Sequence, residues 1–303
     1  MFVRRRFLQL SGATLATALL APKGAQAAPV SPHRQGAVDA IAAAGDFAAL
    51  ETASGGRLGV TLLDTASGRR IGYRQDERFP MCSTFKALLA AAVLARCDQG
   101  RLSLQQRVGV QARAIQQHSP VACRHVGSDM SVRELCRAAV TTSDNTAANL
   151  LLALLGGPVQ LTAFLRAHGD AVTRNDRVEP EMNKFVAGDP RDTTSPAAMV
   201  ASLQRCVLGD VLSPTSRQEL ADWLIDNQTG DTCLRAGLGP RWRIGDKTGS
   251  NAVDIRNDIA VLWPMGGGTP WVLAAYLQGA RVNSDARDAV IARVGALADT
   301  LIG

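Results

Sequence analysis

The middle of the chain repeats apolar residues three and four positions apart, which is the spacing of a helix that buries one face. The repeat predicts helices over 83–97, 131–142, 145–155, 158–168, 196–208 and 214–227, with two more at 36–53 and 284–302. One stretch, residues 170–194, lacks the repeat and is rich in Asp, Asn, Arg and Pro. A long irregular stretch inside a compact domain is usually functional, so we expect this segment to contribute to a site.

Shorter apolar runs toward both ends of the chain predict strands. Residues 57–74 have the pattern of two strands joined by a turn at Ser67-Gly68. Three more strands are expected at 241–250, 256–264 and 270–279. Strands from the two ends can share a sheet only if the helical block is inserted between them. The sequence therefore predicts an α/β sandwich formed by about 36–80 and 231–303, an all-α lobe of about 81–230, and a cleft between the two.

The first 27 residues have the layout of an export signal. A charged start is followed by an apolar stretch from Phe7 to Ala21 and by small residues around Ala25 and Ala27. The run Arg4-Arg5-Arg6-Phe7-Leu8 resembles a twin-arginine signal, which is read as an address. We therefore expect export to the periplasm by the twin-arginine route and a mature domain of residues 28–303. No later stretch reaches the ~18 unbroken apolar residues of a membrane span, so we expect no membrane contact in the mature form.

Charge and ligand spacing exclude several classes of function. The chain has 33 basic and 27 acidic residues, and the predicted signal holds four of the basic ones, which leaves 29 against 27, about +2. With no basic run left, nucleic-acid binding has little support. The four His show no HxH or HExxH spacing and the six Cys no CxxC pair, so we expect no metal and no cofactor. We also expect a monomer.

The cysteines allow two interpretations in an exported chain. Some of the six can form disulfides in an oxidising compartment. Three of them lie within apolar helical patterns, where a buried thiol is the commoner state: Cys97, Cys136 and Cys206.

Lysine is rare in this chain, and its placement indicates chemistry. Only four of the 33 basic residues are Lys, and Lys86 follows Ser83 by one helical turn. Arg stays protonated, whereas a buried Lys can lose its proton and act as a base for a nearby hydroxyl. Ser83 begins the predicted helix, where free backbone N–H groups stabilise negative charge. A Ser at that position is equally typical of a helix N-cap.

Three further polar motifs lie in predicted loops or at element ends. Ser143-Asp144-Asn145 precedes a helix, and Lys247-Thr248-Gly249-Ser250 ends a strand. In the irregular segment, Glu179 and Asn183 are spaced to hold a water, and an Arg177–Asp192 pair would fix the ends of the loop. Alone, these motifs are also typical of a capping turn, a polar turn and a solvated acidic loop. All of them together, in this order, are not explained by chance.

Taken together, the motifs resemble those of the class A serine β-lactamases over essentially the whole mature chain. The family's short motifs stand as Ser83-Thr84-Phe85-Lys86, Ser143-Asp144-Asn145 and Lys247-Thr248-Gly249. Its omega loop corresponds to the irregular segment and carries Arg177-Val178-Glu179-Pro180-Glu181-Met182-Asn183. The resemblance implies a five-stranded antiparallel sheet with flanking terminal helices and an inserted helical domain. It also implies hydrolysis of β-lactam antibiotics through an acyl-serine intermediate.

The resemblance assigns a role to each motif. Ser83 would attack the lactam carbonyl, and either Lys86 or Glu179 would take its proton. Backbone N–H groups of Ser83 and Ser250 would hold the oxyanion. Ser143 would protonate the departing nitrogen and Asn145 would bind the substrate's side-chain amide. The substrate carboxylate would meet Lys247, Thr248 and Ser250 beside Gly249, while Glu179 and Asn183 would activate the hydrolytic water.

Three further expectations come from the same resemblance. His118 stands where many members carry an aromatic wall residue, so it would line the cleft mouth, although a plain surface His is equally compatible. Arg256 falls where some members keep an Arg that binds the carboxylate, for which a planar guanidinium is suited. The peptide bond between Glu179 and Pro180 is expected to be cis. Some members pair the Cys before the nucleophile with a second Cys whose place is taken here by Asn251, so Cys82 is not expected to form that disulfide.

Two other functions share part of this pattern. A penicillin-binding D,D-peptidase would be acylated at the same Ser83 but would deacylate slowly, and the Glu179–Asn183 pair argues against it. A non-catalytic periplasmic β-lactam sensor would bind without turnover.

Overall fold

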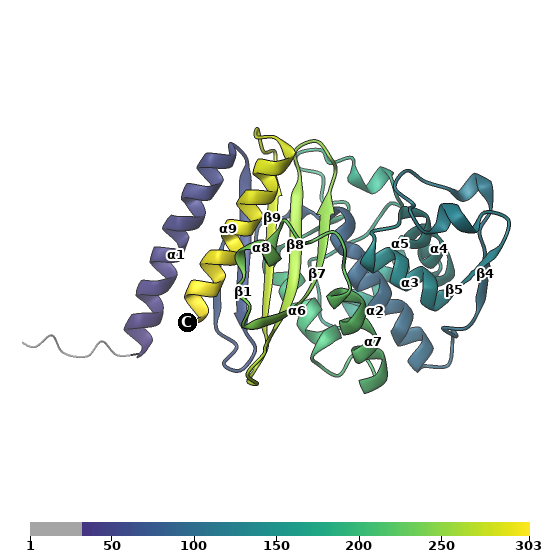
Figure 1. Ribbon diagram of the computed structural model, residues 1–303, viewed down its shortest axis with the longest axis horizontal. Helices are drawn as coiled ribbons and strands as arrows, with labels where there is room; N and C mark the ends of the chain where they lie inside the picture. The colour runs from purple at the N-terminus through teal and green to yellow at the C-terminus, as the bar shows by residue number, and fades with distance from the viewer. Residues whose placement is uncertain (1–31) are drawn as a thin grey trace, which may run out of the picture.

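The computed structural model describes the backbone of residues 32–303 and the side chains of residues 43–303. The predicted signal, residues 1–27, lies outside the described residues. Figure 1 shows a sheet packed between helices, with a helical region beside it.

The central sheet has five strands in the order β2-β1-β9-β8-β7, and every neighbouring pair is antiparallel. The strands are β1 (Arg57–Asp64), β2 (Arg70–Tyr73), β7 (Trp242–Ser250), β8 (Arg256–Pro264) and β9 (Trp271–Gln278). All five predicted strands are confirmed. Since β1 pairs with β9, the two ends of the chain share one sheet, and the intervening helices are an insertion.

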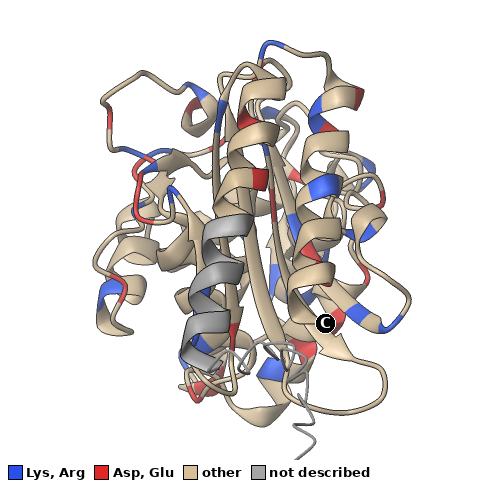
Figure 2. Cartoon of the chain, turned by 90° about the vertical axis from the view of Figure 1, so that its left-hand side faces the viewer, with Lys and Arg blue, Asp and Glu red and all other residues tan. Residues whose placement is uncertain are grey.

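Two terminal helices cover one face of the sheet. They are α1 (Pro32–Ser54) and α9 (Ser284–Ile302), which lie side by side in front of the strands in Figure 2. Phe47 of α1 and Ile291 and Val294 of α9 pack in one buried cluster with Leu58 and Leu273 of the sheet. Successive side chains of a strand point to opposite faces of the sheet, so the strands contribute one set of side chains to this cluster and the other set to a second buried cluster on the other face.

The other face of the sheet packs against α6 (Pro196–Val207), which contacts β1, β8 and β9. The inserted block contains α2 (Phe85–Asp98), α3 (Val132–Thr141), α4 (Asn145–Leu155), α5 (Pro158–Ala167) and α7 (Pro214–Ile225). A short α8 (Leu234–Gly237) leads back to the sheet. The predicted helices are confirmed, with ends that differ by at most two residues except at the start of α1, which begins at Pro32 rather than at residue 36.

Helix α2 is the centre of the helical block. Each residue from Phe85 to Ala95 is buried, and α2 contacts α3, α4, α5, α6 and α7. Because other helices surround α2, it is apolar all round. Its small alanine side chains let those helices approach closely. The residue that follows Ser83 by three, Lys86, is therefore fixed in the middle of a core.

The sequence pattern did not reveal the shortest elements. These are the paired strands β3 (Phe79–Pro80) with β6 (Thr193–Thr194) and β4 (Arg107–Gly109) with β5 (Asp129–Ser131), and the 3₁₀ turns Cys82–Thr84, Ala112–Ala114, Ala122–His125 and Glu181–Asn183. Two or three residues are too few to establish a period. The β3–β6 pair matters for the site, because it joins the end of the irregular segment to the chain just before Ser83.

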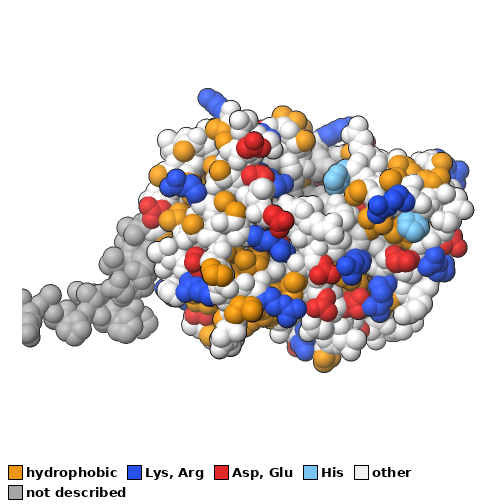
Figure 3. Space-filling view, viewed as in Figure 1, with side chains coloured by type: hydrophobic (Ala, Val, Ile, Leu, Met, Phe, Trp, Pro, Cys, Tyr) orange, Lys and Arg blue, Asp and Glu red, His pale blue; other side chains and the backbone are white. Residues whose placement is uncertain are grey.

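Within residues 32–303, no single helix has the length and apolar composition of a membrane span, although α4 and α5 pass that test together across a 68° bend. Acidic and basic side chains alternate over the face shown in Figure 3, so this surface carries mixed charge.

Candidate active site

Ser83 lies in a 3₁₀ turn, Cys82–Thr84, and α2 begins only at Phe85. The expectation that the helix begins at Ser83 is therefore wrong by two residues. No side chain caps this helix start, which removes the N-cap interpretation of Ser83. Cys82 has a positive φ of 45°, a conformation that is uncommon outside Gly and indicates a turn held by its surroundings.

Three residues of the sheet hold that turn. The Asn257 Nδ2 donates to the carbonyl oxygens of Pro80 (2.9 Å) and Met81 (3.1 Å). The Tyr276 hydroxyl lies 3.1 Å from Thr84 Oγ1, which itself donates to Met81 O. A Cβ at Gly249 would lie 2.7 Å from the Met81 oxygen. Strand β7 can thus approach the Ser83 turn only because position 249 is Gly.

Asn257 and Tyr276 were not predicted from the sequence. Tyr276 is a polar side chain in the otherwise apolar middle of β9, whereas Asn257 lies beside the buried Asp258 near the start of β8; both Asn257 and Tyr276 are buried. A buried polar group needs a partner, so an Asn within a buried strand is the signal that could have pointed to the site.

Lys86 is at the centre of the cluster of candidate residues. Its Nζ lies 2.9 Å from Ser83 Oγ and 3.1 Å from Glu179 Oε1, and it donates to Asn145 Oδ1 (2.5 Å) and to the Ser143 carbonyl (2.9 Å). The side chains of Lys86 and Glu179 are fully buried. Burial lowers the pKa of Lys86, an effect that the Glu179 carboxylate opposes. An amine with a lowered pKa gives up its proton more readily, so Lys86 can act as a base toward the Ser83 hydroxyl.

Glu179 is fixed from two sides. Asn149 of α4 accepts a hydrogen bond from the Glu179 backbone N–H at its Oδ1 (2.9 Å), and its Nδ2 donates to the Glu179 carbonyl oxygen (2.8 Å). Asn183 Nδ2 donates to Glu179 Oε2 (2.5 Å), and the other carboxylate oxygen lies 3.5 Å from Ser83 Oγ. The Glu179–Pro180 peptide bond is cis, as expected. Asn149 was not predicted from the sequence, because its helical spacing does not distinguish it from a surface residue.

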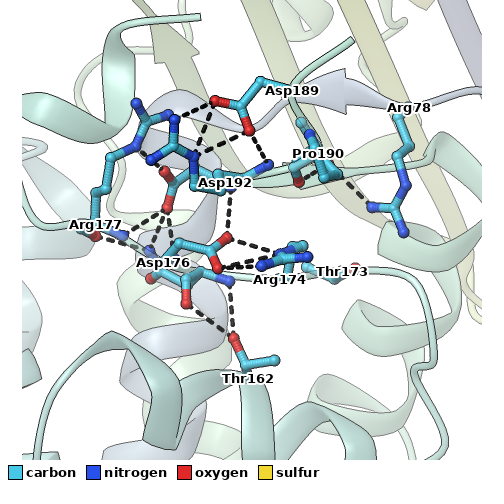
Figure 4. Close-up of polar contacts among 12 residues, drawn as sticks. Arg78, Thr162, Thr173, Arg174, Asp176, Arg177, Asp189, Pro190 and Asp192 are labelled. Atoms are coloured by element: carbon cyan, nitrogen blue, oxygen red, sulfur yellow. Dashed lines mark hydrogen bonds and ion pairs between the residues drawn. The ribbon is translucent and has the colours of Figure 1, made fainter.

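The ends of the irregular segment are joined by a polar network, drawn in Figure 4. Arg177 Nε lies 2.6 Å from Asp192 Oδ2, which confirms the predicted pair. The other carboxylate oxygen of Asp192 accepts the backbone N–H groups of Asp176 (2.7 Å) and Arg177 (3.0 Å) and the amide of Asn175 (3.0 Å). Asp192 is 1% exposed. A single buried carboxylate therefore fixes the loop that presents Glu179.

The three side chains of the Ser143-Asp144-Asn145 motif make different contacts. Asp144 caps α4 by accepting the Ala147 N–H (2.8 Å), so the capping interpretation applies to this residue. Ser143 has a positive φ of 59°, and its Oγ accepts a hydrogen bond from Lys247 Nζ (3.1 Å). Asn145 donates from Nδ2 to the Gln117 carbonyl (2.9 Å), which turns its Oδ1 toward Lys86.

Lys247 is the second buried lysine of the site. Its Nζ donates to the Thr248 carbonyl (2.8 Å) and to Ser143, and the side chain is fully buried. Burial, together with repulsion from Lys86, lowers the pKa of Lys247 to about 7. The charge of Lys247 therefore depends on pH in the physiological range.

A cleft of about 490 Å³ contains nine of the twelve candidate residues in its lining: Ser83, His118, Ser143, Asn145, Asn183, Thr248, Gly249, Ser250 and Arg256. The other three, Lys86, Glu179 and Lys247, are fully or almost fully buried and contact this lining from below. The structure thus brings all twelve together. A larger groove of about 600 Å³, between α7 and the ends of β7 and β8, contains none of them.

Arg256 is less free than expected. Its Nε lies 2.7 Å from Asp288 Oδ1 and 3.1 Å from Cys233 Sγ. The guanidinium lines the cleft but is already paired with Asp288. The pairing was not expected, because Asp288 lies 32 residues away on α9 and contacts Arg256 only in the folded chain. His118 lies at the cleft with a positive φ of 55°, and its Nε2 is 3.0 Å from the Thr142 carbonyl oxygen.

All six cysteines are free, as expected for Cys82. Cys136 and Cys206 are buried thiols and Cys97 is half-buried. Across residues 43–303 no three His, Cys, Asp or Glu side chains are placed to share a metal ion.

Known proteins resemble the chain in sequence and in structure. The model of the β-lactamase enzyme family matches residues 42–301. β-Lactamase L2 of Stenotrophomonas maltophilia is 62% identical over 303 residues, which cover 100% of both chains. β-Lactamase CTX-M-8 of Citrobacter amalonaticus is 46% identical over 81% of this chain and 84% of its own.

Two solved structures have the same fold. The crystal structure of L2 complexed with relebactam superposes with a TM-score of 0.84 and 67% identity, covering 87% of this chain and 98% of that one. A β-lactamase from Xanthomonas campestris gives a TM-score of 0.86 and 54% identity, with 88% and 99% coverage.

Proposed function

Because the chain belongs to the β-lactamase enzyme family, as a class A serine β-lactamase, we propose that Ser83 is the nucleophile of its reaction. The protein hydrolyses the β-lactam amide bond of antibiotics and thereby gives resistance. The observation that carries the assignment is the contact of Ser83, at the cleft, with the buried Lys86 and Glu179: Lys86 Nζ lies 2.9 Å from Ser83 Oγ and 3.1 Å from Glu179 Oε1.

Acylation is the first step. Ser83 Oγ attacks the lactam carbonyl, and its proton goes to a neighbouring base. Lys86 is at 2.9 Å and Glu179 at 3.5 Å, so the shorter contact favours Lys86 in its neutral form. The backbone N–H groups of Ser83 and Ser250 stabilise the oxyanion, each typically worth about 10²–10³ in rate. Ser143, linked to both lysines, returns a proton to the lactam nitrogen as the ring opens.

Deacylation is the step that separates a hydrolase from a penicillin-binding protein. Glu179 and Asn183 are 2.5 Å apart next to Ser83, and together they can hold one water against the acyl carbonyl. Glu179 takes the proton of that water, and the hydroxide releases the product from Ser83. A D,D-peptidase or a sensor has no need for a fixed carboxylate at this position.

Substrate recognition falls to the remaining candidates. Asn145 binds the side-chain amide, and His118 forms the wall at the mouth of the cleft. The carboxylate is held by Lys247, Thr248 and Ser250, with Arg256 beside them. The close approach at Gly249 positions this strand against Ser83. The mature protein acts as a monomer, without nucleic acid, membrane or cofactor.

The direct test of the function is turnover of nitrocefin by the purified mature protein. A β-lactamase gives many turnovers per molecule. A single stoichiometric burst would favour the penicillin-binding protein, and binding without colour change would favour the sensor.

Class A β-lactamases are typically exported to the periplasm, and we propose the twin-arginine route for this chain. Changing Arg5 and Arg6 to Lys should leave the protein in the cytoplasm, and so should a host that lacks the twin-arginine translocase. Periplasmic activity in both cases would contradict this route.

Arg256→Ser should weaken the transition state for penicillins by roughly the 1.5–3 kcal/mol typical of hydrogen bonds to charged groups. The planar guanidinium lines the cleft and can share its remaining N–H groups with a carboxylate even while Asp288 holds Nε. Comparison of kcat/KM across penicillins provides the measurement. An unchanged kcat/KM would exclude a role in binding.

The pH profile should report Lys247. Its pKa is lowered to about 7, so the ammonium is present below that pH and is lost as the pH rises through it. Because kcat/KM reports groups of the free enzyme, we expect kcat/KM for carboxylate-bearing substrates to fall on the alkaline side from about pH 7. Lys247→Arg should move this fall to higher pH, since Arg stays protonated. An alkaline limb that is identical in the two proteins would assign it to another group, such as Lys86.

A further inference from the structure

Thr229, in the segment between α7 and α8, lines the cleft next to Thr248, in the part that we assign to the substrate carboxylate. Its Oγ1 is 2.5 Å from Thr248 Oγ1. Thr229 is half-buried, and Thr248 is 3% exposed. None of the steps above uses Thr229. The question is which of the two hydroxyls donates, because each has only one proton.

The Asn227 side chain answers that question. The backbone N–H of Thr229 points at Asn227 Oδ1 (3.2 Å), and a backbone N–H can only donate. The other end of the amide, Nδ2, donates to Asp246 Oδ2 (2.5 Å). Asn227 is 4% exposed. Both contacts place the amide oxygen toward Thr229, so its orientation does not depend on the protonation state of Asp246.

The direction of the remaining hydrogen bonds then follows. Thr229 Oγ1 lies 2.9 Å from Asn227 Oδ1, an acceptor without a proton, so the Thr229 hydroxyl donates there. With that proton in use, the short contact between the two threonines requires Thr248 to be the donor. In the free enzyme the Thr248 proton therefore points at Thr229, and Thr248 presents only lone pairs to the cleft.

A carboxylate only accepts hydrogen bonds, so it cannot bind to Thr248 in this arrangement. Binding requires the Thr248 proton to turn toward the substrate. Thr229 Oγ1 would then face Thr248 Oγ1 at 2.5 Å without a proton between them, unless its own proton leaves Asn227. Asn227 Oδ1 tolerates the loss because it retains the Thr229 N–H.

We propose that Thr229 and Thr248 form a two-hydroxyl switch whose two protons turn together when a substrate carboxylate binds. In the free enzyme Thr248 donates to Thr229 and Thr229 donates to Asn227. In the complex Thr229 donates to Thr248 and Thr248 donates to the carboxylate. Thr229 is thus a positioning residue for carboxylate recognition, acting through Thr248. The inference rests on the proposed role of Thr248 in binding that carboxylate.

The kinetic test is Thr229→Val, which keeps the shape and removes the hydroxyl that holds the Thr248 proton. A typical net hydrogen bond between neutral groups corresponds to about 2- to 10-fold in affinity. We expect kcat/KM for benzylpenicillin to rise by about that factor while kcat stays unchanged. The methyl ester of benzylpenicillin, whose neutral carbonyl accepts a weaker hydrogen bond from Thr248, should show a smaller change. Thr229→Ser, which retains the hydroxyl, should behave as the wild type.

Thr248→Val separates the switch from the site on which it depends. If Thr248→Val lowers kcat/KM more for benzylpenicillin than for its ester, Thr248 does bind the carboxylate. An unchanged or lower value for Thr229→Val would then overturn the switch alone. If Thr248→Val has no effect, the carboxylate assignment fails and the switch fails with it.

Neutron diffraction of the deuterated protein tests the proton positions without reference to activity, because ordinary X-ray structures do not locate hydrogens. We expect a deuteron on Thr248 directed at Thr229 in the free enzyme. In a complex with a carboxylate-bearing product, the deuteron on Thr229 should be directed at Thr248. A free-enzyme map with the Thr229 deuteron directed at Thr248 would overturn the proposal.

Discussion

Glu179→Gln should still be acylated at Ser83 by penicillins, yet release product about 10²–10⁴-fold more slowly, the usual contribution of a general base. The amide can keep the hydrogen bond to Asn183 and hold the water, but it cannot take the water's proton. Acylation has a second proton acceptor in Lys86, 2.9 Å from Ser83 Oγ. We therefore expect acylation to continue through Lys86, whereas deacylation should lose its base.

Rapid mixing with nitrocefin provides the measurement. The variant should give a burst of one product per enzyme followed by a steady state that is slower by the factor above. Asn183→Ser is a matched comparison, because it keeps a smaller hydrogen-bond donor beside an intact Glu179 carboxylate. A steady-state rate equal to that of the wild type, with no burst, would remove Glu179 from deacylation and favour the penicillin-binding protein alternative.

Lys86→Met should slow acylation by about 10²–10⁴-fold, and it should also destabilise the fold. The buried pair of Lys86 and Glu179 would lose its cation and leave an isolated carboxylate. Breaking such a pair typically costs about 3–5 kcal/mol, whereas removing both partners costs far less. Adding Glu179→Gln to Lys86→Met should therefore affect the acylation rate and the free energy of unfolding differently.

The double variant Lys86→Met with Glu179→Gln distinguishes the two effects. It should recover much of the lost stability in urea unfolding, since no buried charge remains. Its acylation should stay slow, because neither base is present. A single Lys86→Met variant that is as stable as the wild type and is acylated as fast would show that Lys86 is neither an ion-pair partner of consequence nor a base.

The larger elements could be predicted from the sequence because they are long enough to show a period. The helix over 284–302 was placed at its observed ends, and the hairpin at Ser67-Gly68 was found from its turn chemistry. The start of α2 was not, because the 3₁₀ turn that carries Ser83 depends on contacts with β7, β8 and β9 rather than on local preference.

In the site, too, some residues could be predicted from the sequence and others could not. Motif residues were found because their spacing along the chain carries the signal. Asn149 and Asn257 were missed because their partners, Glu179 and the Pro80–Met81 carbonyls, lie 30 and more than 170 residues away. The pairing of Arg256 with Asp288 was missed for the same reason. Long-range hydrogen bonds of single polar residues leave no periodic trace in a sequence.

The central claim is that one serine is acylated and one carboxylate releases it, and intact-protein mass spectrometry of Glu179→Gln mixed with benzylpenicillin tests it most directly. We predict a species heavier by one drug molecule that persists for minutes or longer, and peptide mapping should place the added mass on the segment that contains Ser83. Ser83→Ala in the same background should show no adduct. An adduct on another residue, or turnover at the wild-type rate without an adduct, would contradict the account.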